Sequence, residues 1–220
     1  MPRKSWFRIT NQAGGPGADL WLYDEIGCYG ITASDLTHEL SEITSPEINV
    51  HINSRGGEVF DGIAIYECLK AHPSKVICHI DALAASIASV IAMAGDEIIM
   101  GRSAQMMIHK AAGSCWGTDD DMTATAAVLR GLSDTIAGIY EARCGKTKDY
   151  WLELMIAESW FFAQQAVDAG LADRLADPKE RPIVPQPTEP IEEPEDEWND
   201  QLVSTAILGF RYADQTRSGD

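Results

Sequence analysis

Basic residues are scarce in this sequence, with 17 lysines and arginines against 34 acidic residues and a net charge of −17 over 220 residues. Proteins that bind nucleic acid neutralise phosphates with a basic patch, and the sequence contains no such patch. Long apolar runs are also lacking: the longest, residues 82–95, has fourteen residues and includes two serines. A bilayer span needs roughly 20 apolar residues. We therefore expect neither nucleic acid nor a membrane as a partner.

Paired cysteines and nucleotide-binding motifs are missing as well. The five cysteines have no C-x-x-C spacing, which disfavours a zinc site or a redox pair and indicates free thiols in a reducing compartment. Neither G-x-G-x-x-G nor a P-loop lysine is present. The first residues lack the continuous apolar region of a secretory signal. We expect a cytoplasmic protein with no metal and no cofactor.

The charge distribution predicts a domain boundary near residue 177. Residues 178–220 carry ten acidic and four basic residues, and six of the ten prolines fall between Pro178 and Pro194. Frequent proline blocks helix formation, and like charges repel one another. We expect a domain at 1–177 followed by a disordered acidic tail at 178–220. Within this tail, the apolar segment 202–210 is either a short docking segment or a frayed end.

Alternating strand and helix patterns in residues 18–175 predict an α/β fold with a mostly parallel sheet covered by helices. The expected strands are 18–23, 47–52, 75–80, 97–100, 105–109 and 172–175. The expected helices are 32–43, 59–71, 86–94, 119–143, 148–157 and 163–169. We expect a turn between the last two helices.

Two adjacent glycines, Gly56 and Gly57, follow the strand at 47–52 in the sequence N-S-R-G-G. Glycine permits positive φ and leaves backbone N–H groups uncovered, a geometry suited to binding a negative oxygen. A tight turn with no ligand would produce the same pattern.

A hydroxyl group begins the helix of small residues in the sequence D-A-L-A-A-S-I-A-S. Ser86 lies at the start of that helix, in the positive end of the helix dipole, where alanines allow close approach. Ser89 lies on nearly the same face and is the competing candidate. Small residues would also serve tight helix packing.

His109 ends an apolar strand and leads into a glycine-containing loop, a common place for catalytic groups. Imidazole titrates near neutrality and is the usual base for a serine nucleophile, and an acid normally fixes its orientation. We expect the other four histidines to be structural or exposed.

The order of these motifs resembles the proteolytic subunit of the Clp protease (ClpP). The resemblance rests on N-S-R-G-G, A-A-S, M-I-H, a long helix and A-V-D-A-G-L-A-D, and it covers residues 20–175. It implies the ClpP/crotonase-like fold of stacked ββα units. The N-terminal sequence and the acidic tail are most similar to those of the ClpP-related head-maturation proteases of phages and prophages.

The resemblance implies a serine peptidase with Ser86 as nucleophile and His109 as general base. It also implies an oxyanion hole made by the backbone N–H groups of Gly57 and Ile87. Alignment on the glycine of A-V-D-A-G-L places Glu158 where the family has its triad aspartate. Asp168 and Asp173 are the alternatives for the acid.

The resemblance further implies a substrate-binding segment that includes Gly113, Ser114 and Cys115. It implies homo-oligomeric, heptameric rings assembled through the long helix, whose face with Ala127, Val128, Leu129, Leu132 and Ile136 is apolar. Burial within its own domain would give that face the same pattern. Partners would be polypeptide substrates, together with an ATPase unfoldase or a phage capsid or scaffold protein. Arg55 and Lys110 replace residues usual in the family, beside the expected substrate channel.

These observations favour a self-compartmentalising serine endopeptidase. Two alternatives remain open: a non-catalytic ClpP-like ring or scaffold subunit, and a crotonase-type enzyme acting on acyl-CoA. Such enzymes share the fold but normally use glutamates for acid/base chemistry.

Overall fold

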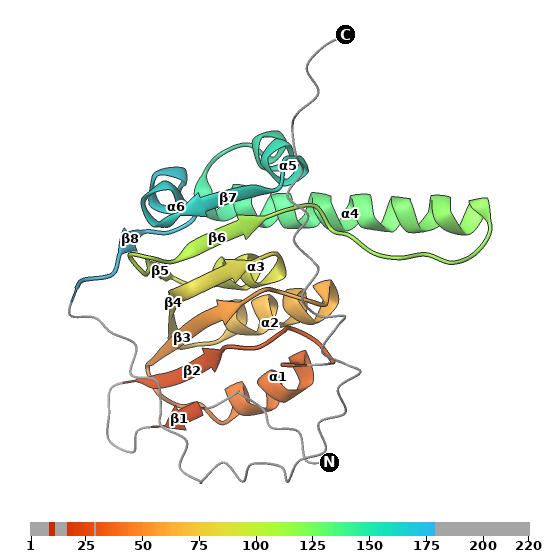
Figure 1. Cartoon of the computed structure of the whole chain (residues 1–220). Coiled ribbons are helices and arrows are strands. Elements are labelled where there is room, and N and C mark those ends of the chain that lie inside the picture. The colour runs from red at the N-terminus through yellow and green to blue at the C-terminus, as the bar shows by residue number, and fades with distance from the viewer. Residues whose placement is uncertain (1–8, 12–16, 29, 179–220) are drawn as a thin grey trace, which may run out of the picture. The chain divides into compact units, whose positions relative to one another are not determined.

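The computed structural model describes residues 9–11, 17–28 and 30–178, which form an α/β fold built on an eight-stranded sheet (Figure 1). The strands are β1 (Ile9–Asn11), β2 (Ala18–Leu22), β3 (Glu47–Ser54), β4 (Lys75–Ala85), β5 (Glu97–Met100), β6 (Gln105–Ile108), β7 (Ser159–Phe162) and β8 (Arg174–Leu175). The helices are α1 (Ala33–Ser41), α2 (Val59–Ala71), α3 (Ile87–Ala92), α4 (Asp119–Cys144), α5 (Lys148–Ile156) and α6 (Ala163–Ala169). The predicted tail lies outside the described residues apart from Pro178.

The sheet is mostly parallel, as predicted, in the order β1-β2-β3-β4-β5-β8. β4 pairs with two strands along its length: Ile77–Ile80 pairs with β5, and Leu83–Ala85 pairs with β6. β6 also pairs with β7, and this pairing is antiparallel. The far end of β4 is therefore the point where the main sheet continues into the antiparallel β6–β7 pair, and the chain passes into α3 at this point.

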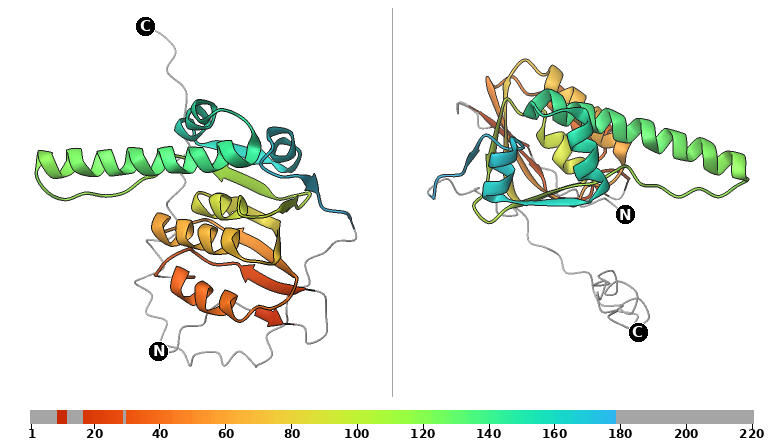
Figure 2. Two further views of the ribbon diagram at one scale, coloured as in Figure 1. Left: turned by 180° about the vertical axis from the view of Figure 1, so that it is seen from behind. Right: turned by 90° about the horizontal axis from the view of Figure 1, so that it is seen from above.

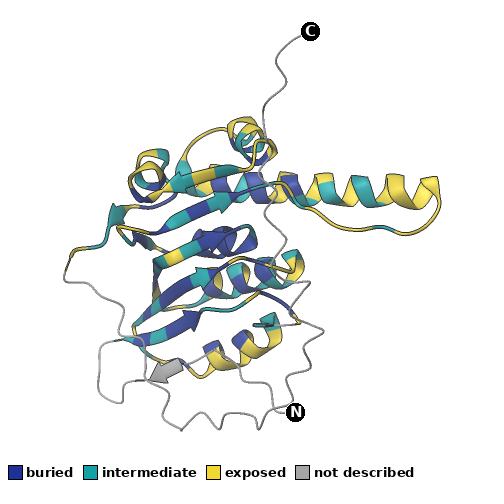
Figure 3. Cartoon of the chain, viewed as in Figure 1, coloured by how far each residue is buried: buried dark blue, intermediate teal, exposed yellow. Residues whose placement is uncertain are grey.

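Helices α1, α2 and α3 lie along one face of the sheet (Figure 2). Alternation along β3 puts Ile48, Val50 and Ile52 in the core beneath these helices, and β4 contributes Val76 and Ile80 to the same core. The burial colours show α3 buried throughout, whereas α1 and α2 also carry exposed residues (Figure 3). The core therefore holds β3 and β4 in register, and with them the loops at their carboxyl ends.

α4 begins at a capping box, in which Thr118 and Asp121 bond to each other's backbone, and it ends at Gly145 in the left-handed conformation. Its first half is largely exposed and projects beyond the sheet (Figure 3). Its second half packs on the domain through Ile136 and Tyr140, which are buried. The apolar face predicted on this helix is thus buried by its own domain only toward the carboxyl end.

Most predicted elements are present with similar bounds, and the helix expected over 59–71 is α2 with the same ends. Three elements differ. β1 has no counterpart among the expected strands. β4 continues to Ala85, five residues beyond the predicted strand. The segment expected to be a turn between α5 and α6 is the strand β7. In the described part of the chain, no helix combines the length and apolarity needed to cross a membrane.

Candidate active site

Ser86 occupies a sharp turn between β4 and α3. Its φ is 55° and its ψ is −129°, a conformation that residues with a side chain rarely adopt. The turn is held by the Ser86 N–H, which donates to the Met107 carbonyl at 2.8 Å. Strained strand-to-helix turns of this kind present a hydroxyl group for reaction, and such strain concentrates at functional sites.

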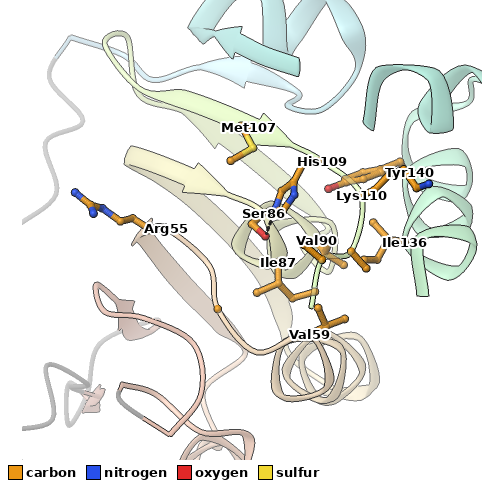
Figure 4. A pocket seen from close by; sticks show the side chains of 13 residues that line it. Arg55, Val59, Ser86, Ile87, Val90, Met107, His109, Lys110, Ile136 and Tyr140 are labelled. Atoms are coloured by element: carbon orange, nitrogen blue, oxygen red, sulfur yellow. Dashed lines mark hydrogen bonds between the residues drawn. The ribbon is translucent and has the colours of Figure 1, made fainter. Parts of the chain in front are cut away.

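His109 directly follows β6, and its Nε2 lies 2.7 Å from the Ser86 Oγ (Figure 4). The parallel pairing of Ala85 with Met107 brings the ends of β4 and β6 together, so the two side chains meet just beyond the paired residues. Both residues are half-buried. A hydroxyl and an imidazole at hydrogen-bond distance can form a nucleophile and its base.

Ser89, the competing candidate, points away from this pair. Its side chain is 0% exposed; its Oγ donates to the Ser86 carbonyl at 2.5 Å and lies 2.8 Å from the Tyr140 hydroxyl. Because Ser89 has one hydroxyl proton, Tyr140 donates in the second bond. Burial raises the pKa of Tyr140, so its hydroxyl stays protonated as this bond requires. Ser89 therefore supports the turn of Ser86 from beneath.

The Gly56-Gly57 turn lies directly against the Ser86 turn. Gly56 has φ 94° and Gly57 has φ 146°; a Cβ on Gly56 would lie 2.7 Å from the Ala85 carbonyl, and one on Gly57 only 2.0 Å from the Ile26 carbonyl. Conformation and space thus both require glycine. The Ser54 hydroxyl accepts from the Gly56 N–H at 3.1 Å and donates to a backbone carbonyl of the neighbouring loop.

The two predicted oxyanion donors stand beside the serine. Gly57 and Ile87 both line the same pocket as Ser86. Among the hydrogen bonds of the described residues, none is donated by the backbone N–H of either one. Two N–H groups without protein acceptors, next to a hydroxyl, can bind an oxygen that gains negative charge.

A pocket of about 310 Å³ opens at the Ser86–His109 pair (Figure 4). Its wall is mainly apolar and includes Val90 from α3 together with Ile136 and Tyr140 from α4. The remaining lining residues are Arg55, Gly57, Val59, Ser86, Ile87, Met107, His109, Lys110, Ala111 and Ala112. Arg55 and Lys110, which replace residues usual in the family, are exposed cations of this lining. The sequence does not reveal that Ile136 and Tyr140 of α4 line this pocket, because apolar residues at helical spacing are equally expected from packing of the helix.

Glu158 lies beside the histidine in the strand register but does not bond to it. Ile108 pairs with Ser159, so the next residues outward on the two strands are His109 and Glu158. Glu158 is exposed, has φ 50°, and makes no hydrogen bond to His109 among the contacts of the described residues. Its role as the acid stays a prediction.

The two alternative acids are engaged elsewhere. Asp168 accepts a hydrogen bond from Gln164 within α6, at 2.9 Å. Asp173 accepts from the Ile98 N–H at 2.7 Å and forms an ion pair with Arg143. Neither carboxylate lines the pocket.

The predicted substrate-binding residues Gly113, Ser114 and Cys115 lie beyond the pocket, whose lining ends at Ala112. They belong to the loop that runs from β6 to α4, and Gly113 lies close to Leu129 of that helix. Gly113 and Ser114 are exposed, and Cys115 is half-buried. Their role in binding also stays a prediction.

The Clp protease family model matches residues 29–179, a segment that contains the serine, the histidine and the glycine turn. The chain belongs to the Clp protease family. It is 27% identical over 160 residues to the ATP-dependent Clp protease proteolytic subunit 1 of Leifsonia xyli, covering 71% of this chain and 81% of the relative. It is 29% identical over 142 residues to the corresponding subunit of Deinococcus radiodurans, covering 62% and 68%.

The fold agrees with this membership. A ClpP1 mutant structure from Listeria monocytogenes superposes with a TM-score of 0.65 at 20% identity, covering 73% of this chain and 92% of that one. The α/β fold with a mostly parallel sheet is therefore that of ClpP. The predicted kinship with phage and prophage proteases stays a prediction.

Proposed function

We propose that this Clp protease family member is a serine endopeptidase with Ser86 as nucleophile and His109 as general base. The observation that carries the proposal is the 2.7 Å contact between the Ser86 Oγ and the His109 Nε2, both of which line the pocket. Family membership supports a peptidase, and the strained backbone at Ser86 supports its choice as nucleophile.

The reaction proceeds through an acyl-enzyme. The Ser86 Oγ attacks the scissile carbonyl carbon while the His109 Nε2 takes the hydroxyl proton. The carbonyl oxygen becomes an oxyanion and accepts hydrogen bonds from the N–H groups of Gly57 and Ile87; losing one such donor typically costs on the order of 10²-fold in rate. The C–N bond then breaks as His109 returns the proton to the leaving amine. Water, deprotonated by His109, releases the acyl group, and Glu158 stabilises the imidazolium.

The proposal includes a homo-oligomer formed through α4. The amino-terminal half of this helix projects from the domain and exposes large apolar side chains, among them Met122 and Val128. A neighbouring subunit packed on this half of the helix would cover these side chains. A heptameric ring that encloses the pockets would restrict cleavage to extended polypeptides. The relatives are named as subunits of ATP-dependent proteases, so an ATPase unfoldase is the first partner to test. A phage capsid or scaffold protein is the proposed alternative substrate or partner.

The test is active-site labelling with a fluorophosphonate, followed by peptide mapping and measurement of the native mass. We expect one adduct, on Ser86, no labelling or peptide cleavage by Ser86→Ala, and a mass of several chains. Ser103→Ala is the matched control, because Ser103 is an exposed serine between β5 and β6. Full cleavage by Ser86→Ala would overturn the proposal. A wild-type oligomer that neither labels nor cleaves would indicate a non-catalytic ring subunit.

A further inference from the structure

β7 exposes two large aromatic side chains on one face. Trp160 is 46% exposed and Phe162 is 61% exposed, whereas Phe161 between them packs against the core. In the described part of the chain, β7 pairs with β6 alone, so it is an edge strand. Proteins usually avoid exposed apolar edge strands because they invite association. Two exposed aromatic side chains on such an edge therefore indicate that this face is a binding surface.

The register places this face next to the reaction centre. Trp160 pairs with Met107 across the antiparallel ladder, and directly opposed residues project from the same side of a sheet. Met107 itself lines the pocket with Ser86 and His109. On its other side, Met107 pairs with Ala85, the residue before the serine. Trp160 therefore extends the apolar lining at the level of Ser86, one strand beyond Met107.

The pocket wall from α3 and α4 and this extension lie on different sides of the serine. Val90 and Ile136 lie on one side of the Ser86–His109 pair, and Met107 lies on the other (Figure 4). A peptide attacked at Ser86 extends in both directions from its scissile bond. After attack, the acyl group stays bonded to Ser86, and the amine product leaves past the histidine that protonates it.

We propose that Trp160 and Met107 form an apolar subsite for the substrate segment released as the amine product. The subsite deepens the proposed peptidase function and rests on it. It favours a large apolar or aromatic side chain directly after the scissile bond, because an aromatic ring can pack against an indole and a thioether at once. Met107 belongs both to the pocket and to this subsite. We therefore assign a substrate side chain as the occupant.

The experiment compares two internally quenched peptides that differ only in the residue after the scissile bond, phenylalanine or serine. We expect the wild-type oligomer to prefer the phenylalanine peptide in kcat/KM, and Trp160→Ala to reduce that preference about tenfold, the usual cost of truncating a central aromatic contact. Trp160→Phe should restore most of it. Ile156→Ala is the control, because Ile156 is 68% exposed on α5, outside the β6–β7 pairing, and its loss should leave the preference unchanged.

An equal fall for both peptides, or an unchanged preference, would overturn the subsite. A lower native mass of Trp160→Ala would also overturn it, because a second copy of the chain would then be the occupant. Hydrolysis of a peptide p-nitrophenyl ester, which has no residue after the scissile bond, tests the peptidase separately. A wild-type protein that fails with this ester lacks the proposed function itself, and the subsite falls with it.

Discussion

His109 and His51 have opposite surroundings within one domain. His109 lines the pocket and contacts a serine hydroxyl, and no carboxylate bonds to it in the described part of the chain. His51 is 8% exposed, and its Nδ1 lies 3.0 Å from an oxygen of Asp81. The Tyr23 hydroxyl donates to the same oxygen at 2.6 Å. The histidine with the better carboxylate partner is thus the one without a nucleophile.

Aromatic stacking explains why His51 is held so firmly. Its ring lies between Trp21, at a centroid distance of 5.3 Å, and His79, at 4.7 Å. His79 in turn contacts Asn49, which donates to Asp19 at 3.1 Å. A satisfied polar network of this kind orders a sheet surface. A histidine–carboxylate pair therefore does not locate a catalytic site; a strained nucleophile beside a pocket is the more selective sign.

Removing each imidazole gives the largest contrast between the two networks. We expect His109→Ala to lower kcat/KM by about 10³-fold or more, because Ser86 loses its base. His51→Ala should retain its rate per labelled site but lose about 2 kcal/mol in the free energy of unfolding, because Asp81 keeps only the Tyr23 bond. Peptide hydrolysis normalised to fluorophosphonate titration and urea unfolding measure the two effects. If kcat/KM fell as much in His51→Ala as in His109→Ala, the two histidines could not be distinguished as structural and catalytic.

Local sequence pattern predicted much of this architecture. α2 has the predicted bounds because its core positions follow helical spacing, and Thr32, the first residue of the helix expected over 32–43, caps α1. β7 lies where the sequence pattern predicts a turn, because four residues are too few to show a strand period. Its pairing with β6, a contact between distant segments, makes it a strand. The three consecutive aromatic residues at 160–162 are the available sequence signal, since aromatics are enriched in strands.

The site was predictable only in part for a similar reason. Motif order pointed to Ser86 and His109, and the structure brings them together. The positive φ of Ser86 has no sequence signal, because the turn is held by segments distant in sequence, with Gly56 against it and its N–H bonded to Met107. The sequence also does not predict that Tyr140 lines the pocket, because α4 is distant in sequence from Ser86. The carboxylate was placed by alignment alone, and its exposed position leaves its contribution to experiment.

Removing each carboxylate charge sharpens the comparison. Glu158→Gln should lower kcat about tenfold, less than loss of a buried triad acid, because solvent screens an exposed carboxylate. Asp81→Asn should leave kcat in place and lower stability instead. Steady-state kinetics and urea unfolding of both variants check this, and a wild-type rate in Glu158→Gln would exclude it as the acid.

The smallest expected effect concerns the Tyr23 hydroxyl. Burial is the main cause that raises the pKa of Tyr23 above its ordinary value of 10.0, and the hydrogen bond to Asp81 is the second. The folded state therefore keeps the phenol protonated where the unfolded chain begins to lose its proton. The corresponding stability is fully present below about pH 10 and is lost as the pH rises beyond it.

Tyr23→Phe should be less stable than wild type by about 1 kcal/mol at pH 8, through loss of the hydrogen bond. The difference between the two proteins should shrink between pH 9 and pH 11. Urea unfolding at several pH values measures this difference. Cys78, whose pKa burial raises to about 12, and Tyr140 add alkaline instability to both proteins equally, so the comparison isolates Tyr23. A constant difference across this range would mean that the Tyr23 proton is not held by folding, and that the Asp81 network is as open to solvent as the Ser86 site.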